Sequence, residues 1–167
     1  MEESRKRFVI AVYVENKYGV LTRVAAMFMR KGFNIDSLTV GETDDPAYSR
    51  ITITLHGRED DKEQLVNQLY KLHNVRKVKL LESGGSVERE LMIIKVSNSP
   101  EKRAEIMAAS EIFRAKIIDY TTDTICVEVT GEPTKIKAFI DIMKPLGIVE
   151  MCRTGVVALE RGTNMMS

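Results

Sequence analysis

The chain has 167 residues, of which 44% are hydrophobic and 29% are charged. This composition is typical of a packed globular protein and argues against a disordered, fibrous or disulfide-scaffold chain. The 25 basic and 24 acidic residues leave a formal charge of +1. Because binding to nucleic-acid phosphates requires a surplus of Lys and Arg, we expect no nucleic-acid partner.

The strongly apolar stretches, such as residues 8–14, are far shorter than the roughly 20 residues that a membrane-spanning helix needs. The charged N-terminus is followed by no apolar signal core. Cys126 and Cys152 are isolated from each other and form no C-x-x-C motif. We therefore expect a cytoplasmic protein with no membrane segment and with two buried or half-buried thiols.

The first half of the chain predicts the element order βαββαβ. Residues 8–14 form an apolar strand that ends at Glu15, and apolar residues at helical spacing follow from Val20 to Met29, with Gly32 as the stop. Residues 33–40 and 51–55 predict two strands joined by a long hairpin loop. An acidic segment at 58–63 then opens a second helix, and residues 75–80 form the fourth strand.

The same pattern begins again after the sequence S-G-G-S at 83–86, which is typical of a flexible joint. It predicts strands at 91–96, 117–120 and 125–129, helices at 101–113 and 136–143, and a last strand within 148–159. Pro100 is expected in the first turn of the first of these helices. We therefore predict a domain at 1–82, a linker at 83–87 and a second domain at 88–167.

The two halves align as repeats of one topology. A shift of 74 residues places Ile51, Leu65 and Val75 on Ile125, Phe139 and Val149, and the first strands align at a shift of 82. The predicted fold class is α+β, with two ferredoxin-like βαββαβ units, each a four-stranded antiparallel sheet with two helices on one face. One face of each sheet stays uncovered, so we expect self-association into at least a dimer.

The residues of an enzyme active site are missing. His56 and His73 have no triad partner in an obvious motif, and partly exposed structural histidines are the favoured interpretation. The acidic loop T-D-D-P at 43–46 has no further metal ligands nearby, and no phosphate-binding glycine motif occurs. We predict no catalytic residue, no metal site and no cofactor in this chain.

The segment E-N-K-Y-G-V-L-T-R-V at 15–24 joins the first strand to the first helix. Asn16 could cap the helix, Gly19 permits close approach of a ligand, and free amides at a helix start bind a carboxylate. On spacing alone, an ordinary cap and turn remain the favoured interpretation. The second repeat has S-N-S-P-E-K here, so Pro100 removes the glycine and a donor, and any such site belongs to the first repeat.

Five motifs are spread along nearly the whole length of the chain: N-K-Y-G-V-L-T-R-V, G-F-N-I-D-S-L-T-V-G, V-E-R-E, E-I-F-R-A-K-I-I-D and T-G-V-V-A-L-E-R-G. In this combination the chain resembles the small, regulatory subunit of acetohydroxyacid synthase, also called acetolactate synthase, which has an N-terminal ACT domain. The resemblance implies a subunit without an active site that binds and activates the catalytic large subunit and makes it sensitive to valine. Thiamine diphosphate, magnesium and FAD are then expected on that catalytic partner, in branched-chain amino-acid biosynthesis.

The resemblance also implies a homodimer through the ACT domains, with the effector between the first strand–helix loop of one copy and the start of the second strand of the other. The implied valine-binding residues are Asn16, Gly19, Val20, Leu21, Asn34 and Ile35. Tyr18 departs from the smaller residue or proline common in such loops, which puts effector choice in doubt. The alternatives are a free-standing amino-acid-responsive regulator of transcription or of another enzyme, and a small enzyme using a carboxylate or His56.

Overall fold

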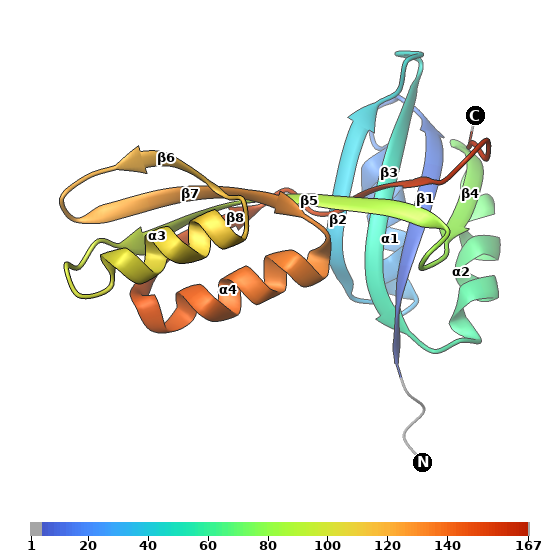
Figure 1. The fold of residues 1–167 in the computed structure, drawn as a ribbon. Helices are drawn as coiled ribbons and strands as arrows, with labels where there is room; N and C mark the ends of the chain where they lie inside the picture. Colours follow the sequence, from blue (N-terminus) through green and yellow to red (C-terminus); the bar gives the residue numbers. More distant parts are fainter. Residues whose placement is uncertain (1–4, 167) are drawn as a thin grey trace. The chain divides into compact units, whose positions relative to one another are not determined.

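The computed structural model describes residues 5–166, which divide into two compact units. Within the described range, unit 1 comprises 5–87 and 156–166, and unit 2 comprises 88–155. The elements, drawn in Figure 1, are β1 (Lys6–Glu15), α1 (Val20–Arg30), β2 (Ile35–Glu42), β3 (Tyr48–Gly57), α2 (Asp61–Tyr70), β4 (Val75–Leu81), β5 (Ser86–Ser97), α3 (Arg103–Ile112), β6 (Lys116–Tyr120), β7 (Thr124–Gly131), α4 (Pro133–Gly147), β8 (Ile148–Arg153) and β9 (Val157–Glu160). None of the helices in this range is long and apolar enough to cross a membrane.

Unit 1 contains an antiparallel sheet with the strand order β2-β3-β1-β4. Alternate residues of β1 and β3 point to one face, where Ile10 pairs with Ile53 and Val12 with Ile51. These side chains join the apolar stripes of α1 and α2 in one buried cluster. The predicted ferredoxin-like topology of the first repeat is confirmed, and β2 is an edge strand of its sheet.

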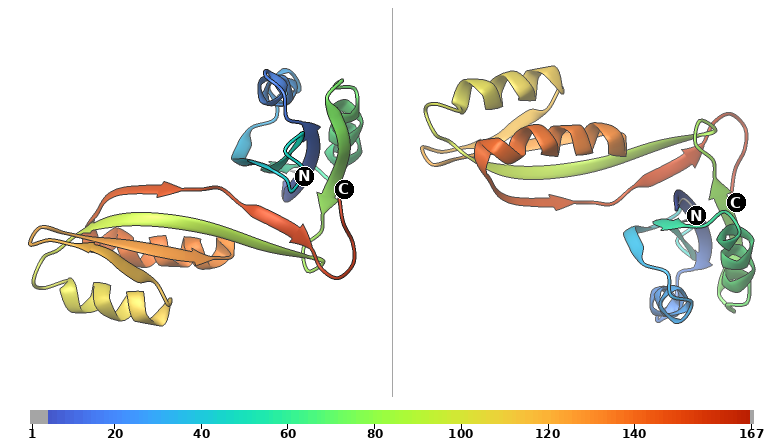
Figure 2. Two further views of the ribbon diagram at one scale, coloured as in Figure 1. Left: turned by 90° about the horizontal axis from the view of Figure 1, so that it is seen from above. Right: turned by 90° about the horizontal axis from the view of Figure 1, so that it is seen from below.

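Unit 2 repeats this arrangement with the strand order β6-β7-β5-β8. Both views in Figure 2 show α3 and α4 on the same side of the sheet. The core joins the inward residues of β5 and β7 to both helices, and Phe113 and Phe139 meet edge to face with their ring centroids 5.2 Å apart. The second ferredoxin-like unit is therefore also confirmed.

Backbone irregularities recur at equivalent positions in the two units. The pairing of β1 with β4 shifts register between Tyr13 and Val14, and that of β5 with β8 shifts between Lys95 and Val96, which are 82 residues further on. The helix ends also match, since Gly32 (φ 75°) follows α1 and Arg114 (φ 53°) follows α3 in the left-handed conformation. Because glycine adopts this conformation without a Cβ penalty and arginine does not, only unit 1 has the unstrained residue here.

The C-terminal segment does not follow the predicted domain boundary. The expected single strand within 148–159 is two strands, and residues 156–166 belong to unit 1 rather than to the predicted domain at 88–167. Burial explains the difference, because Val156, Ala158 and Met166 pack with Val9, Ala11 and Leu81 on the sheet face opposite α1 and α2. The open sheet face that the sequence predicts for the first repeat is therefore partly covered by the chain itself.

Polar contacts fasten the same C-terminal segment to β3 and β4. Arg50 donates from Nη2 to the carbonyl oxygen of Ala158 (2.7 Å), and Lys79 pairs with Glu160. Burial lowers the pKa of Arg50, and the nearby Glu160 carboxylate opposes that shift. The backbone amide of Arg161 also donates to the carbonyl oxygen of Gly85 (2.9 Å), in the turn that precedes β5. The predicted linker at 83–87 is shorter than expected, because β5 already begins at Ser86.

Two other predictions are corrected by the structure. α3 begins at Arg103, so Pro100 precedes the helix instead of lying in its first turn. Cys126 is buried on the β7 face opposite the core residues Ile125 and Val127, whereas Cys152 is exposed at the edge strand β8. Both cysteines are free thiols.

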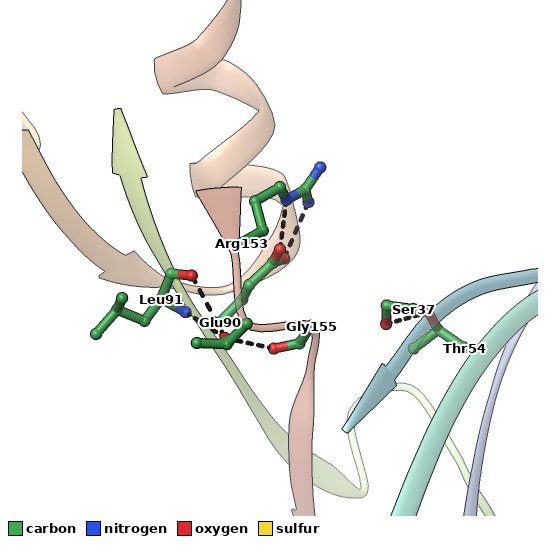
Figure 3. Close-up of polar contacts among 7 residues, drawn as sticks. Ser37, Thr54, Glu90, Leu91, Arg153 and Gly155 are labelled. Atoms are coloured by element: carbon green, nitrogen blue, oxygen red, sulfur yellow. Dashed lines mark hydrogen bonds and ion pairs between the residues drawn. The ribbon is translucent and has the colours of Figure 1, made fainter. Parts of the chain in front are cut away.

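A buried ion pair holds the ends of β5 and β8 together in unit 2, as Figure 3 shows. The Glu90 carboxylate, whose residue is 3% exposed, accepts from Nε and Nη2 of Arg153, the latter at 3.0 Å. This hydrogen bonding raises the pKa of Arg153. Beside it, the Leu91 amide donates to Thr154 Oγ1 (3.2 Å).

The same figure shows the contact of Ser37 with Thr54 in unit 1, where the two hydroxyl oxygens lie 2.6 Å apart.

The substitution Ala158→Asp tests the packing of the C-terminal segment. Ala158 is 4% exposed, so an aspartate would bury a carboxylate in the apolar contact with Val9 and Ala11. We expect it to lower the free energy of unfolding by about 3 kcal/mol in urea titrations followed by circular dichroism. Val157→Asp is the control, since Val157 is 51% exposed and its replacement should cost less than about 1 kcal/mol. Equal losses in the two variants would contradict the burial of this segment.

Candidate effector site

The start of α1 presents unused backbone donors to solvent. Gly19 is the residue before the helix and adopts φ 79°, and no side chain caps the helix. The amides of Val20 and Arg23 donate to Lys17 and Gly19, while those of Tyr18, Gly19, Leu21 and Thr22 have no acceptor within the described residues. A Cβ at Gly19 would meet nothing within 4 Å, so the space beside these amides is open. The positive end of the helix dipole adds to their attraction for an anion.

Asn16 does not cap α1 as the sequence suggested. Its amide group instead donates to Glu42 Oε1 (3.1 Å) and to the carbonyl oxygen of Pro46 (3.0 Å), and its backbone amide donates to Ala47 (2.8 Å). Cap geometry fails because Asn16 lies three positions before Gly19, the residue that stands at the cap position. Asn16 thereby ties the β1–α1 loop to the β2–β3 hairpin, and its Oδ1 is without a partner among the residues described.

The sequence does not predict the buried polar network that lies below the loop. The Glu15 carboxylate accepts from Asn74 Nδ2 (2.8 Å), Lys17 Nζ (2.9 Å) and the guanidinium of Arg76. Asn74 in turn accepts on Oδ1 from Arg23 Nη1 of α1 (2.5 Å). Glu15 is 8% exposed, so this network fixes the end of β1 against α1 and the α2–β4 turn. No sequence motif marks these residues, because they meet only through the fold.

Charged side chains of both signs surround the loop. The cations Lys17 and Arg76 pair with the Glu15 carboxylate, and the acids Glu42 and Asp45 lie on the hairpin side. The attraction for an anion therefore rests on the free amides and the helix dipole. The loop is also braced by stacking of the Tyr13 and Tyr48 rings, with their centroids 4.8 Å apart.

The other predicted site residues divide between two ends of α1. Val20 is buried in the core and supports the loop from below, whereas Leu21 is 42% exposed beside the free amides. Asn34 is exposed at the far end of the helix, and the adjacent Ile35 is half-buried. Because α1 has 11 residues, its ends lie about 16 Å apart. One chain therefore does not bring Asn34 and Ile35 to Asn16 and Gly19.

Asn34 lines two hollows of unit 1. The first is an open apolar groove of about 410 Å³, lined by Ala25, Phe28, Met29, Gly32, Phe33, Asn34 and Ile35. The second is a cavity of about 190 Å³ that also includes His56 and Asp36, whose side chains lie 2.6 Å apart. Within the described part of the chain, no three His, Cys, Asp or Glu side chains are grouped to hold a metal ion.

The equivalent loop of unit 2 is closed by its own side chains. Asn98 repeats the contacts of Asn16, since its backbone amide donates to Asp123 (2.8 Å) and its side-chain amide to Thr121 (2.6 Å). Its Oδ1, however, accepts from Arg103 Nε (2.7 Å), and Asn98 is 5% exposed. The side-chain oxygen of this asparagine is therefore hydrogen-bonded in unit 2, whereas in unit 1 it has no partner among the described residues.

Comparisons with known proteins cover both units. The family model described as the small subunit of acetolactate synthase matches residues 89–162, and the model described as an AHAS small subunit-like ACT domain matches residues 10–77. An Archaeoglobus fulgidus protein, described as "Probable acetolactate synthase small subunit", is 51% identical over 156 residues, which cover 93% of this chain and 98% of that protein. The acetolactate synthase small subunit of Bacillus subtilis is 45% identical, with 93% and 91% covered.

A solved structure agrees with these sequence matches. The crystal structure of the acetolactate synthase small subunit from Thermotoga maritima has a TM-score of 0.87 and 40% identity, and the match covers 95% of this chain and 99% of that one. Family models for both units, the sequence relatives and the fold thus point to the same group of proteins. The chain belongs to the family of acetolactate synthase small subunits.

Proposed function

We propose that this chain is the regulatory subunit of acetolactate synthase, which binds and activates the catalytic large subunit and confers feedback inhibition by valine. Membership of the acetolactate synthase small-subunit family supports the catalytic large subunit as the partner. The observation that supports an amino-acid effector is the start of α1, where free amides and Asn16 Oδ1 face open space. The chain itself carries no active site in this proposal, and thiamine diphosphate, magnesium and FAD belong to the catalytic subunit in the cytoplasm.

A two-fold pairing of unit 1 would complete the site. β2 is an edge strand, and Glu42 at its end contacts Asn16 of the loop. If the β2 strands of two copies pair antiparallel, the end of β2 in one copy lies beside the start of β2 in the other. Asn16 and Gly19 of one copy then face Asn34 and Ile35 of the second copy, although the two pairs lie at opposite ends of α1 in each chain.

The chemistry of the two halves suits a branched-chain amino acid. The free amides of residues 18, 19, 21 and 22 donate to the carboxylate, and Asn16 Oδ1 and the Glu42 carboxylate accept from the ammonium. Leu21 of the same copy and Ile35 of the second copy contact the aliphatic side chain. Because the ligand joins two copies, it favours the arrangement in which both halves fit it, and regulation follows from that unequal affinity.

The substitution Gly19→Asp tests the carboxylate site. Both aspartate and asparagine tolerate the left-handed conformation of residue 19, so Gly19→Asn is the matched control that differs only in charge. We expect millimolar valine to raise the thermal midpoint of the wild type and of Gly19→Asn but not of Gly19→Asp. When the proteins are reconstituted with the catalytic subunit, all three should raise acetolactate formation, and valine should fail to inhibit only the assembly containing Gly19→Asp.

These two measurements test different parts of the proposal. No activation by the wild-type chain would contradict the regulatory role, whereas activation without any valine effect on melting or turnover would contradict the valine site. Equal valine responses in Gly19→Asp and Gly19→Asn would show that the carboxylate lies elsewhere.

The substitution Val40→Lys tests pairing through β2. Val40 is 42% exposed on this edge strand, so a two-fold axis near the strand centre would bring two lysines close together. We expect the dimer to dissociate at least about tenfold more readily in sedimentation equilibrium, which corresponds to roughly 1.4 kcal/mol. Val149→Lys, on the edge strand β8 of unit 2, is the control. Dissociation by Val149→Lys instead would place the dimer interface on unit 2.

A further inference from the structure

Tyr18 stands at the tip of the β1–α1 loop with its side chain fully exposed. It makes no hydrogen bond or ring contact with any residue that the structure describes. The loop that carries it is fixed on both sides, by the Asn16 contacts to the β2–β3 hairpin and by the Glu15 network below. A rigid loop therefore holds a large aromatic ring out in solvent, immediately beside the free amides of α1.

The groove at the other end of α1 is larger than the proposed ligand requires. Its volume of about 410 Å³ is widely open to solvent, so a ligand there needs a covering group from another molecule to be buried. Its lining is apolar apart from Asn34, and Met29, which is 74% exposed, forms part of its rim. Methionine side chains adapt readily to aromatic rings and make favourable sulfur–aromatic contacts. The groove therefore offers room and suitable chemistry for a ring in addition to an aliphatic side chain.

We propose that Tyr18 of one copy closes the effector site of the pair, with its ring packed over the ligand side chain and against Met29 and Phe33 of the second copy. This inference rests on the proposed function, because it uses the β2–β2 pairing that places the loop of one copy beside the groove of the other. The closing ring buries an aliphatic side chain and leaves a polar one without partners, so Tyr18 selects for branched apolar amino acids.

The second repeat lacks this device. At the shift of 82 residues that aligns the two loops, Pro100 and Glu101 stand where Tyr18 and Gly19 stand in the first repeat. Neither residue supplies an aromatic ring, and the side-chain oxygen of Asn98 there already accepts a hydrogen bond from Arg103. The closing residue thus occurs only in the loop whose asparagine oxygen and helix amides are available.

A single tryptophan reports on this closure directly. The chain contains no tryptophan, so Tyr18→Trp introduces one fluorophore at the loop tip. We expect saturating valine to shift its emission to the blue and to lower its acrylamide quenching constant about threefold, because the indole leaves water. Tyr18→Trp combined with Val40→Lys, measured at a protein concentration at which sedimentation shows only monomer, should show no such protection with valine.

Calorimetry measures the contribution of the ring to affinity. Tyr18→Ala should bind valine at least about tenfold more weakly, whereas Tyr18→Phe should stay within about twofold, because apolar burial and not the hydroxyl carries the contact. Tyr120→Ala is the control, since Tyr120 is a half-exposed tyrosine in unit 2 and should leave valine affinity unchanged.

The outcomes separate this inference from the proposed function. If calorimetry detects no binding of valine to the wild type, the proposal of a valine site is wrong, and with it the closing role of Tyr18. If the wild type binds valine but Tyr18→Ala binds equally well, or the indole of Tyr18→Trp stays fully quenchable at saturation, the site stands and the closing role of Tyr18 is overturned. Protection of that indole in the Val40→Lys monomer would likewise overturn closure by the second copy.

Discussion

The geometry of the β1–α1 loop in unit 1 depends on the hydrogen bonds and ion pairs of the buried Glu15 carboxylate. It sits where β1 turns toward α1 and receives donors from Asn74, Lys17 and Arg76, while Asn74 reaches α1 through Arg23. A buried carboxylate with these partners is costly to displace, because moving it away from them would leave its charge uncompensated in a low-dielectric region. The direction of the loop, and hence of Asn16, Tyr18 and Gly19, is therefore set by the fold and not by the loop residues alone.

The periodic patterns of the sequence were sufficient to predict the fold of each unit. Strict alternation in β3 and the apolar stripe of α1 identify a strand and a helix without reference to the rest of the chain, and both elements lie where they were predicted. The sequence prediction assigned the C-terminal segment to the second domain, because its short apolar pattern fits the sheet of either unit equally well. Only tertiary contacts with Val9, Ala11 and Leu81 assign residues 156–166 to unit 1.

The candidate site was predictable in its location but not in its contacts. Gly19 has the left-handed backbone that its position before a helix suggested, and the amides beside it are free. The predicted role of Asn16 as a helix cap was wrong. In sequence, an asparagine near a helix start fits a cap and a hydrogen bond to a neighbouring hairpin equally well. The partners that decide between these roles, Glu42 and Pro46, lie 26 and 30 residues away along the chain.

The duplication shows which contacts of Asn16 belong to the fold and which atom they leave free. Asn16 and Asn98 make the same two contacts to their hairpins, so this tie between strand and hairpin is a requirement of the fold in both units. In unit 2 the remaining oxygen is satisfied internally by Arg103 and buried. In unit 1 that oxygen, the adjacent helix amides and the exposed Tyr18 are left for another molecule. Because the same contacts hold the loop in both units, its geometry is set without a ligand, so the proposed effector would not need to order the loop before it binds.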